Sequence, residues 1–194
     1  MGAEIVLVRH GRTEWSVSGQ HTGRTDIPLT EEGRAQAFEL AKSTHVHGRS
    51  FGLVLASPLS RAWDTAQLAG LGGAAEVCDD LMEWDYGDVE GRTTPQVREQ
   101  QPGWDLWVDG VGGGETVEDV GERVDRVIAR IRDAGGDVAL VAHGHVLRIL
   151  AARWIGLDPR GGRHLGLETA SVSVLGWERE TPAVVHWNDT SHLS

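Results

Sequence analysis

Apolar residues along the chain fall into two kinds of segment. Short apolar runs typical of strands cover residues 4–9, 51–56, 137–142, 171–176 and 183–187. Apolar positions at helical spacing cover residues 29–45, 57 to about 69, 115–133 and 146–155. Because strands alternate with helices, the pattern predicts an α/β fold: a three-layer sandwich with a mostly parallel central sheet flanked by helices.

Local signals refine this picture. Thr30 is predicted to cap a helix, and Ser57 with Pro58 predicts the cap and first turn of the next one. Residues 85–114 have weak periodicity and contain two prolines and two tryptophans, so we expect an excursion that covers a site. The sequence shows no internal repeat, and its glycine-rich stretches predict loops rather than linkers. We therefore expect a single domain over residues 1–194.

Composition narrows the classes of partner. The net charge of −11 over 194 residues disfavours nucleic acid and anionic membranes, whereas a local group of arginines can still hold a small phosphorylated substrate. Cys78 is the only cysteine, which excludes an intramolecular disulfide and a cysteine zinc site. The sequence has no secretory signature and no apolar stretch of the roughly 20 residues that span a membrane, so we expect a cytoplasmic protein. Assembly into a homo-oligomer is left open.

Candidate chemistry lies where predicted strands end. Two strands end alike, in LVRHG (residues 7–11) and LVAHG (residues 140–144), and a third ends just before Ser57-Pro58. Ligands of open α/β sheets bind beyond the carboxyl ends of the strands. Three strand ends therefore bring four residues to one edge of the sheet: Arg9, His10, Arg61 and His143. A histidine at one strand end is usually structural, but this group together suits a phosphoryl dianion, because guanidinium forks match its oxygens.

The sequence resembles the histidine phosphatase superfamily, which includes the cofactor-dependent phosphoglycerate mutases. RHG at residues 9–11 is followed in the family's order by six further blocks. These are TG at 22–23, DIPLTEEG at 26–33, SPLSRA at 57–62, LMEWDYG at 81–87, GET at 114–116 and AHG at 142–144. A lone RHG would be a weak signal, whereas the ordered set is specific.

The resemblance implies a role for each matching residue. It implies that His10 is a nucleophile that forms a phosphohistidine, and that Glu83 protonates the leaving oxygen and then activates water. Catalytic and phosphate-binding roles are implied for Arg9, Arg61 and His143, with further contacts to the phosphate from Ser16, Thr22 and Gly23. It implies neither a cofactor nor a metal.

Three positions depart from the family pattern. Arg12 adds a cation near the site, Ser16 replaces an asparagine that mutases often carry, and His145 follows His143-Gly144 where asparagine is common. His10, His143 and His145 could also be metal ligands, although no carboxylate cluster completes such a set. The sequence does not define roles for Arg12, His145 or the Trp-rich residues 84–107.

Hydrolysis is favoured over transfer between substrates. Residues 88–114 contain two cations, Arg92 and Arg98, against five carboxylates, and no lysine or arginine follows Trp187. Such a segment is poorly suited to retain a bisphosphorylated intermediate or to exclude water. The sequence therefore predicts a phosphomonoester hydrolase of histidine acid phosphatase type that acts on a small phosphorylated metabolite. A phosphoglycerate mutase and a phosphoprotein phosphatase remain the alternatives, as does a binding module that has lost catalysis.

Overall fold

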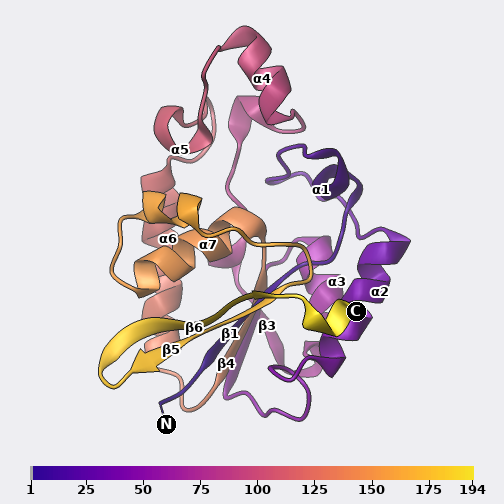
Figure 1. Cartoon of the computed structure of the whole chain (residues 1–194), viewed down its shortest axis with the longest axis vertical. Coiled ribbons are helices and arrows are strands. Elements are labelled where there is room, and N and C mark those ends of the chain that lie inside the picture. The colour runs from indigo at the N-terminus through magenta and orange to yellow at the C-terminus, as the bar shows by residue number, and fades with distance from the viewer. Residues whose placement is uncertain (1) are drawn as a thin grey trace.

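One six-stranded sheet runs through the computed structural model, which describes residues 2–194 (Figure 1). The strand order is β3-β2-β4-β1-β5-β6, with the first four strands parallel and the last two antiparallel to their neighbours. This confirms the predicted α/β fold with a mostly parallel sheet. The strands are β1 (Ile5–Arg9), β2 (Leu53–Ala56), β3 (Ala75–Val77), β4 (Val138–Ala142), β5 (Val172–Glu178) and β6 (Thr181–Asp189).

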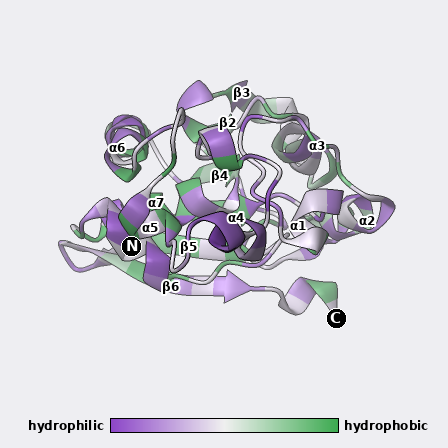
Figure 2. Cartoon of the chain, turned by 90° about the horizontal axis from the view of Figure 1, so that it is seen from above, coloured by the Kyte–Doolittle hydropathy of each residue, from purple (hydrophilic) through white to green (hydrophobic). Residues whose placement is uncertain are grey.

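Helices cover both faces of the sheet, and the alternation along β1 shows why. Ile5 and Leu7 enter the larger core, which includes α6 and α7, whereas Val6 and Val8 enter the core on the other face, which includes α3. Seen from above, α6 and α7 lie on one side of the strands, and α2 and α3 lie on the other (Figure 2). The helices are α1 (Glu14–Ser18), α2 (Glu31–Glu39), α3 (Ser60–Leu68), α4 (Thr94–Gln100), α5 (Leu106–Asp109), α6 (Val117–Arg132) and α7 (Gly144–Trp154).

Two predicted helix boundaries need correction. Thr30 does cap α2, because its side chain accepts a hydrogen bond from the Gly33 N–H, but α2 ends at Glu39 rather than near residue 45. Ser57 does not cap α3, whose N-cap is Leu59. The Ser57 hydroxyl is instead used inside the molecule, where it contacts His143. A cap signal read from sequence thus identified a residue with a tertiary role.

The hydrophobic pattern did not predict four short elements. Strand β3 has three residues, and α1, α4 and α5 have four to seven, too few for a periodic signal. Helix α1 begins with a capping box between Thr13 and Ser16, and α4 begins with one between Thr93 and Gln96. Helices α4 and α5 lie beyond the carboxyl ends of the parallel strands (Figure 1).

The loop after β1 packs directly against the start of α2. A Cβ added to Gly11 would lie 2.3 Å from the Gly33 carbonyl oxygen, closer than side chains tolerate. Glycine at position 11 therefore lets the chain pass α2 immediately after the first predicted catalytic residue. Within residues 2–194, no helix is both long and apolar enough to cross a membrane.

Candidate active site

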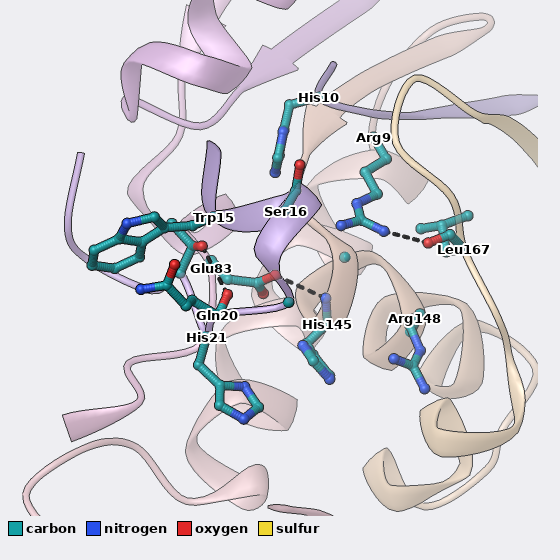
Figure 3. A pocket seen from close by; sticks show the side chains of 13 residues that line it. Arg9, His10, Trp15, Ser16, Gln20, His21, Glu83, His145, Arg148 and Leu167 are labelled. Carbon is teal, nitrogen blue, oxygen red and sulfur yellow. Dashed lines mark hydrogen bonds between the residues drawn. The ribbon is translucent and has the colours of Figure 1, made fainter. Parts of the chain in front are cut away.

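A cavity of about 210 Å³ opens at the carboxyl ends of β1 and β4 (Figure 3). Its walls come from the end of β1, from α1 and the loop after it, from the start of α7 and from Leu167. Among the predicted site residues, five line it: Arg9, His10, Ser16, Thr22 and Glu83. His10 and Arg9 point into the cavity, and the Glu83 carboxylate faces them across it (Figure 3).

His10 is held by the main chain in a single tautomer. Its side chain is only 4% exposed, and Nδ1 lies 2.7 Å from the Gly11 carbonyl oxygen. Because a carbonyl oxygen can only accept, Nδ1 carries the proton and donates it in this bond. The lone pair of the neutral ring is therefore on Nε2, which has no hydrogen-bond partner among residues 2–194.

The environment of His10 also keeps the ring uncharged. Burial, followed by the charges of Arg61 and Arg9, holds the pKa of His10 well below its usual range. Burial is a larger cause of this shift than the two neighbouring cations. A neutral imidazole with a free Nε2 is a competent nucleophile at neutral pH.

Arg9 places a guanidinium beside His10. Its Nη1 donates to the Leu167 carbonyl oxygen, and its Nε is buried without a hydrogen-bond partner in the described chain. A Cβ at position 144 would come within 3.3 Å of the Arg9 Cζ, so Gly144 lets the guanidinium lie over the start of α7. Burial lowers the pKa of Arg9, yet a guanidinium remains protonated at neutral pH.

Glu83 is fixed by three backbone N–H groups. Its Oε1 accepts from Trp84 and Val146 at 3.0 and 2.9 Å, and its Oε2 accepts from His145 at 2.9 Å. The donors from His145 and Val146 belong to the first turn of α7, whose N–H groups have no acceptor within the helix. With one bond fewer, Oε2 is the oxygen with capacity left for a ligand or a proton.

Arg61 and His143 are adjacent to His10 but do not line the cavity. Both are fully buried, and Arg61 Nε donates to His143 Nδ1 at 3.1 Å. His143 Nε2 therefore carries the proton, which it shares with the Ser57 hydroxyl at 2.7 Å. The rings of His10 and His143 meet edge to face at 5.2 Å. Direct contact between His143 and a phosphoryl oxygen would require Nε2–H to leave Ser57.

The remaining predicted residues divide between cavity and scaffold. Thr22 and Gly23 each accept a hydrogen bond from Arg61 through their carbonyl oxygens, and Gly23 does not line the cavity. The Ser16 hydroxyl lines it while completing the capping box of α1. Arg12 is paired with Glu32 at the surface and lines an adjoining cavity instead.

Sequence reasoning missed a polar wall opposite His10. His145, Arg148 and His21 line the cavity, and the Tyr86 hydroxyl lies 2.6 Å from His145 Nδ1. Burial holds the pKa of His145 well below its usual range and raises that of Tyr86 well above it, so both groups are neutral. The sequence signal that joins His145 and Arg148 is helical spacing, since they lie three residues apart in the first turns of α7.

The Trp-rich segment supports this wall from behind. Trp84 and Trp107 are buried and approach the His145 ring at centroid distances of 6.0 and 5.3 Å. Trp15 lines the cavity, whereas Trp84 does not. Residues 85–114 contribute no lining residue among those described, so α1 and its following loop cover the site instead.

The ring nitrogens also bear on the metal interpretation. Arg61 and Ser57 occupy both nitrogens of His143, and Tyr86 occupies Nδ1 of His145. Across residues 2–194, no three histidine, cysteine or carboxylate side chains are grouped as metal ligands. The histidines of this site are arranged for hydrogen bonding.

Comparisons with known proteins identify similar enzymes. An acid phosphatase of Mycobacterium tuberculosis is 42% identical over 183 residues, covering 90% of this chain and 86% of that protein. Sedoheptulose 1,7-bisphosphatase of Saccharomyces cerevisiae is 37% identical, covering 78% and 67%. A probable phosphoglycerate mutase of Cronobacter sakazakii is 30% identical, covering 98% and 94%.

Solved structures place the fold in the same group. The structure of an open reading frame of Mycobacterium tuberculosis superimposes with a TM-score of 0.91 at 37% identity, covering 97% of this chain and 98% of that one. The sequence profile of the histidine phosphatase superfamily (branch 1) matches residues 5–190. The chain is therefore a member of branch 1 of the histidine phosphatase superfamily.

Proposed function

We propose that this protein hydrolyses phosphomonoesters of small metabolites through a phosphohistidine on His10. The observation that carries the proposal is the unprotonated Nε2 of His10, which faces a cavity lined by Arg9 and Glu83. The names of two relatives, an acid phosphatase and a sugar bisphosphatase, support hydrolysis of small phosphorylated molecules.

In the first step, His10 Nε2 attacks phosphorus and the bond from phosphorus to the ester oxygen breaks. Glu83 gives a proton to that oxygen as it leaves, and Arg9 neutralises the phosphoryl oxygens. Arg61 and His143 lie behind His10. Because Arg61 is fully buried, water does not screen the positive charge that it directs at the phosphoryl group. The bond from Nδ1–H to the Gly11 carbonyl stabilises the positive charge that the ring acquires.

In the second step, water attacks the phosphohistidine and the P–N bond breaks. Glu83, now unprotonated, takes a proton from the water, and the electron pair returns to Nε2. The carboxylate needs no movement between these roles, since three backbone bonds hold it beside the same cavity. Phosphate then leaves and the starting tautomer of His10 is restored.

A turnover screen tests the proposal directly. Purified protein would be offered phosphomonoesters of small metabolites, phosphopeptides and 3-phosphoglycerate, with release of inorganic phosphate as the readout. We expect the highest kcat/KM among small phosphomonoesters. Preferential turnover of phosphopeptides would support the phosphoprotein alternative, and absence of turnover on every substrate would contradict the proposal.

Mutase activity is expected to be absent or minor. Neither residues 88–114 nor the chain after Trp187 contributes a lining residue, so neither segment encloses a bisphosphorylated intermediate. The measurement supplies 3-phosphoglycerate with catalytic 2,3-bisphosphoglycerate and follows 2-phosphoglycerate together with free phosphate. Phosphate release from a good monoester should far exceed isomerisation. Isomerisation faster than phosphate release by orders of magnitude would show a compact mutase.

Activity is also expected to be independent of metal ions. Hydrogen bonds within the protein occupy the His143 ring nitrogens, and the cations of the site are guanidinium groups. Exhaustive chelation should leave kcat/KM unchanged, and vanadate should inhibit by imitating the five-coordinate phosphoryl group. A chelated enzyme that is inactive and recovers with zinc or magnesium would contradict this prediction.

We also propose that the protein acts in the cytoplasm and binds no nucleic acid. The free, buried thiol of Cys78 suits a reducing compartment, and the net charge of −11 repels polyanions.

A further inference from the structure

Arg148 is a second cation in the active-site cavity, and none of the steps above uses it. It lies on α7, one turn beyond His145, and lines the same cavity as Arg9 and His10 (Figure 3). The cations predicted near the site from sequence are Arg9, Arg12 and Arg61. Arg12 and Arg61 are absent from the lining of this cavity, whereas Arg148 is present.

The guanidinium of Arg148 is held firmly in place. Its Nε donates to the Gly162 carbonyl at 3.0 Å and its Nη2 donates to the Arg163 carbonyl at 3.1 Å. Its Cζ lies 5.0 Å from the centroid of the Trp107 ring, on which the cation stacks. The side chain is thus ordered before any ligand binds, which lowers the entropic cost of binding.

No carboxylate of the described chain forms an ion pair with this cation, although the charge of Glu83 acts on it from farther away. Most arginines of the chain pair with a carboxylate within 4.0 Å, but Arg148 has no such partner among residues 2–194. A guanidinium has five N–H donors, and the two carbonyls use two of them. Three donors of this half-buried, permanently charged group are therefore left without a carbonyl acceptor, and its side chain lines the cavity.

We infer that Arg148 binds a second anionic group of the substrate, a carboxylate or a second phosphate, on the same small molecule whose phosphoryl group His10 attacks. The inference rests on the proposed function. Arg9 already serves the phosphoryl group, and the neighbours of Arg148 on the wall, His145 and His21, can contact hydroxyl groups as neutral rings. Arg148 is thus a specificity-determining residue, which discriminates between substrates that differ away from the reacting phosphorus.

Matched substrate pairs test this inference. 3-Phosphoglycerate and glycerol 3-phosphate differ by a carboxylate in place of a hydroxymethyl group, and fructose 1,6-bisphosphate and fructose 6-phosphate differ by one phosphate. We expect kcat/KM to favour the substrate with the second anion, in one pair or both, by about 10- to 150-fold. This is the range for one hydrogen-bonded charged contact. The preferred pair identifies the anion.

Two variants of Arg148 and one control test whether Arg148 causes the preference for a second anion. Arg148→Met keeps an unbranched stem against Trp107 and should abolish the preference, because kcat/KM falls more for the substrate with the second anion than for its partner in the pair. Arg148→Lys keeps the charge without the fork and should retain part of the preference. Arg153→Met is the matched control: Arg153 lies on the same helix, pairs with Asp125 and does not line the cavity.

Separate outcomes would overturn the inference and the proposed function. Equal kcat/KM within both pairs for the wild-type protein would overturn the inference alone, as would an equal loss on all four substrates in Arg148→Met. If the wild-type protein hydrolyses none of the four and also fails on nitrophenyl phosphate, the proposed function itself is wrong. Wild-type kinetics decide the first point even if a variant fails to fold.

Discussion

Replacing His10 with alanine is expected to lower kcat by on the order of 10⁴- to 10⁶-fold, the range for removing a member of a nucleophilic unit. The loss should be this large because the imidazole packed against His10, that of His143, is not free to take over the attack. His143 has both ring nitrogens engaged, and Nδ1 of His145 lies against Tyr86. Rapid quenching with ³²P-labelled substrate should give an acid-labile, base-stable phosphoenzyme in the wild-type protein and none in His10→Ala.

A control and a pH profile sharpen this result. His186→Ala, which removes an exposed histidine of β6, should keep the label. Because burial holds the pKa of His10 well below the ordinary value of about 6.5, the ring stays neutral as the pH falls through that value. Loss of kcat/KM from protonation of His10 should therefore begin only well below pH 6.5 or so. Label that persists in His10→Ala would assign the nucleophile elsewhere.

Replacing Glu83 with glutamine is expected to separate two classes of substrate. Alkyl phosphates need a proton on the leaving oxygen, so their kcat/KM should fall by about 10²- to 10⁴-fold. Nitrophenolate leaves without much help, so phosphorylation of His10 by nitrophenyl phosphate should fall much less. Glutamine keeps the acceptor for part of the backbone cradle formed by Trp84, His145 and Val146, which limits structural damage. The measurement compares single-turnover rates on the two substrates.

Asp85→Asn is the matched control for this substitution. Asp85 is two residues from Glu83 in sequence, but it does not line the cavity, and its Oδ1 accepts from the Gly87 N–H. It should behave like the wild-type protein on both substrates. Equal losses on both substrates in Glu83→Gln, or the selective loss in Asp85→Asn, would show that Glu83 is not the leaving-group acid.

Strand ends explain why much of the site could be predicted from the sequence. The apolar runs before His10 and His143 are buried parallel neighbours, so their carboxyl ends meet at one edge, and the residues that follow must share it. Position alone does not say which way a side chain turns. Arg61 lies in the first turn of α3, near the predicted edge of the sheet, yet its guanidinium points inward to His143 rather than into the cavity.

Other features depend on contacts between distant segments and leave little local signal. Arg148 acquires its place from carbonyls 14 and 15 residues later in the chain, and His145 acquires its partner from Tyr86, 59 residues earlier. Ser57 matched a helix cap locally, but the buried ring of His143 competes for its hydroxyl. In each case a tertiary contact overrides or completes what the local sequence specifies.

The tautomer of His10 depends on a backbone oxygen, that of Gly11, and on no other side chain. In many hydrolases a carboxylate orients the catalytic imidazole, so one substitution can remove that partner. Here the acceptor is present whatever amino acids surround it, provided the loop keeps its path past α2. Evolution can therefore vary the opposite wall, including Gln20, His21 and Arg148, to suit new substrates while the attacking nitrogen keeps its lone pair.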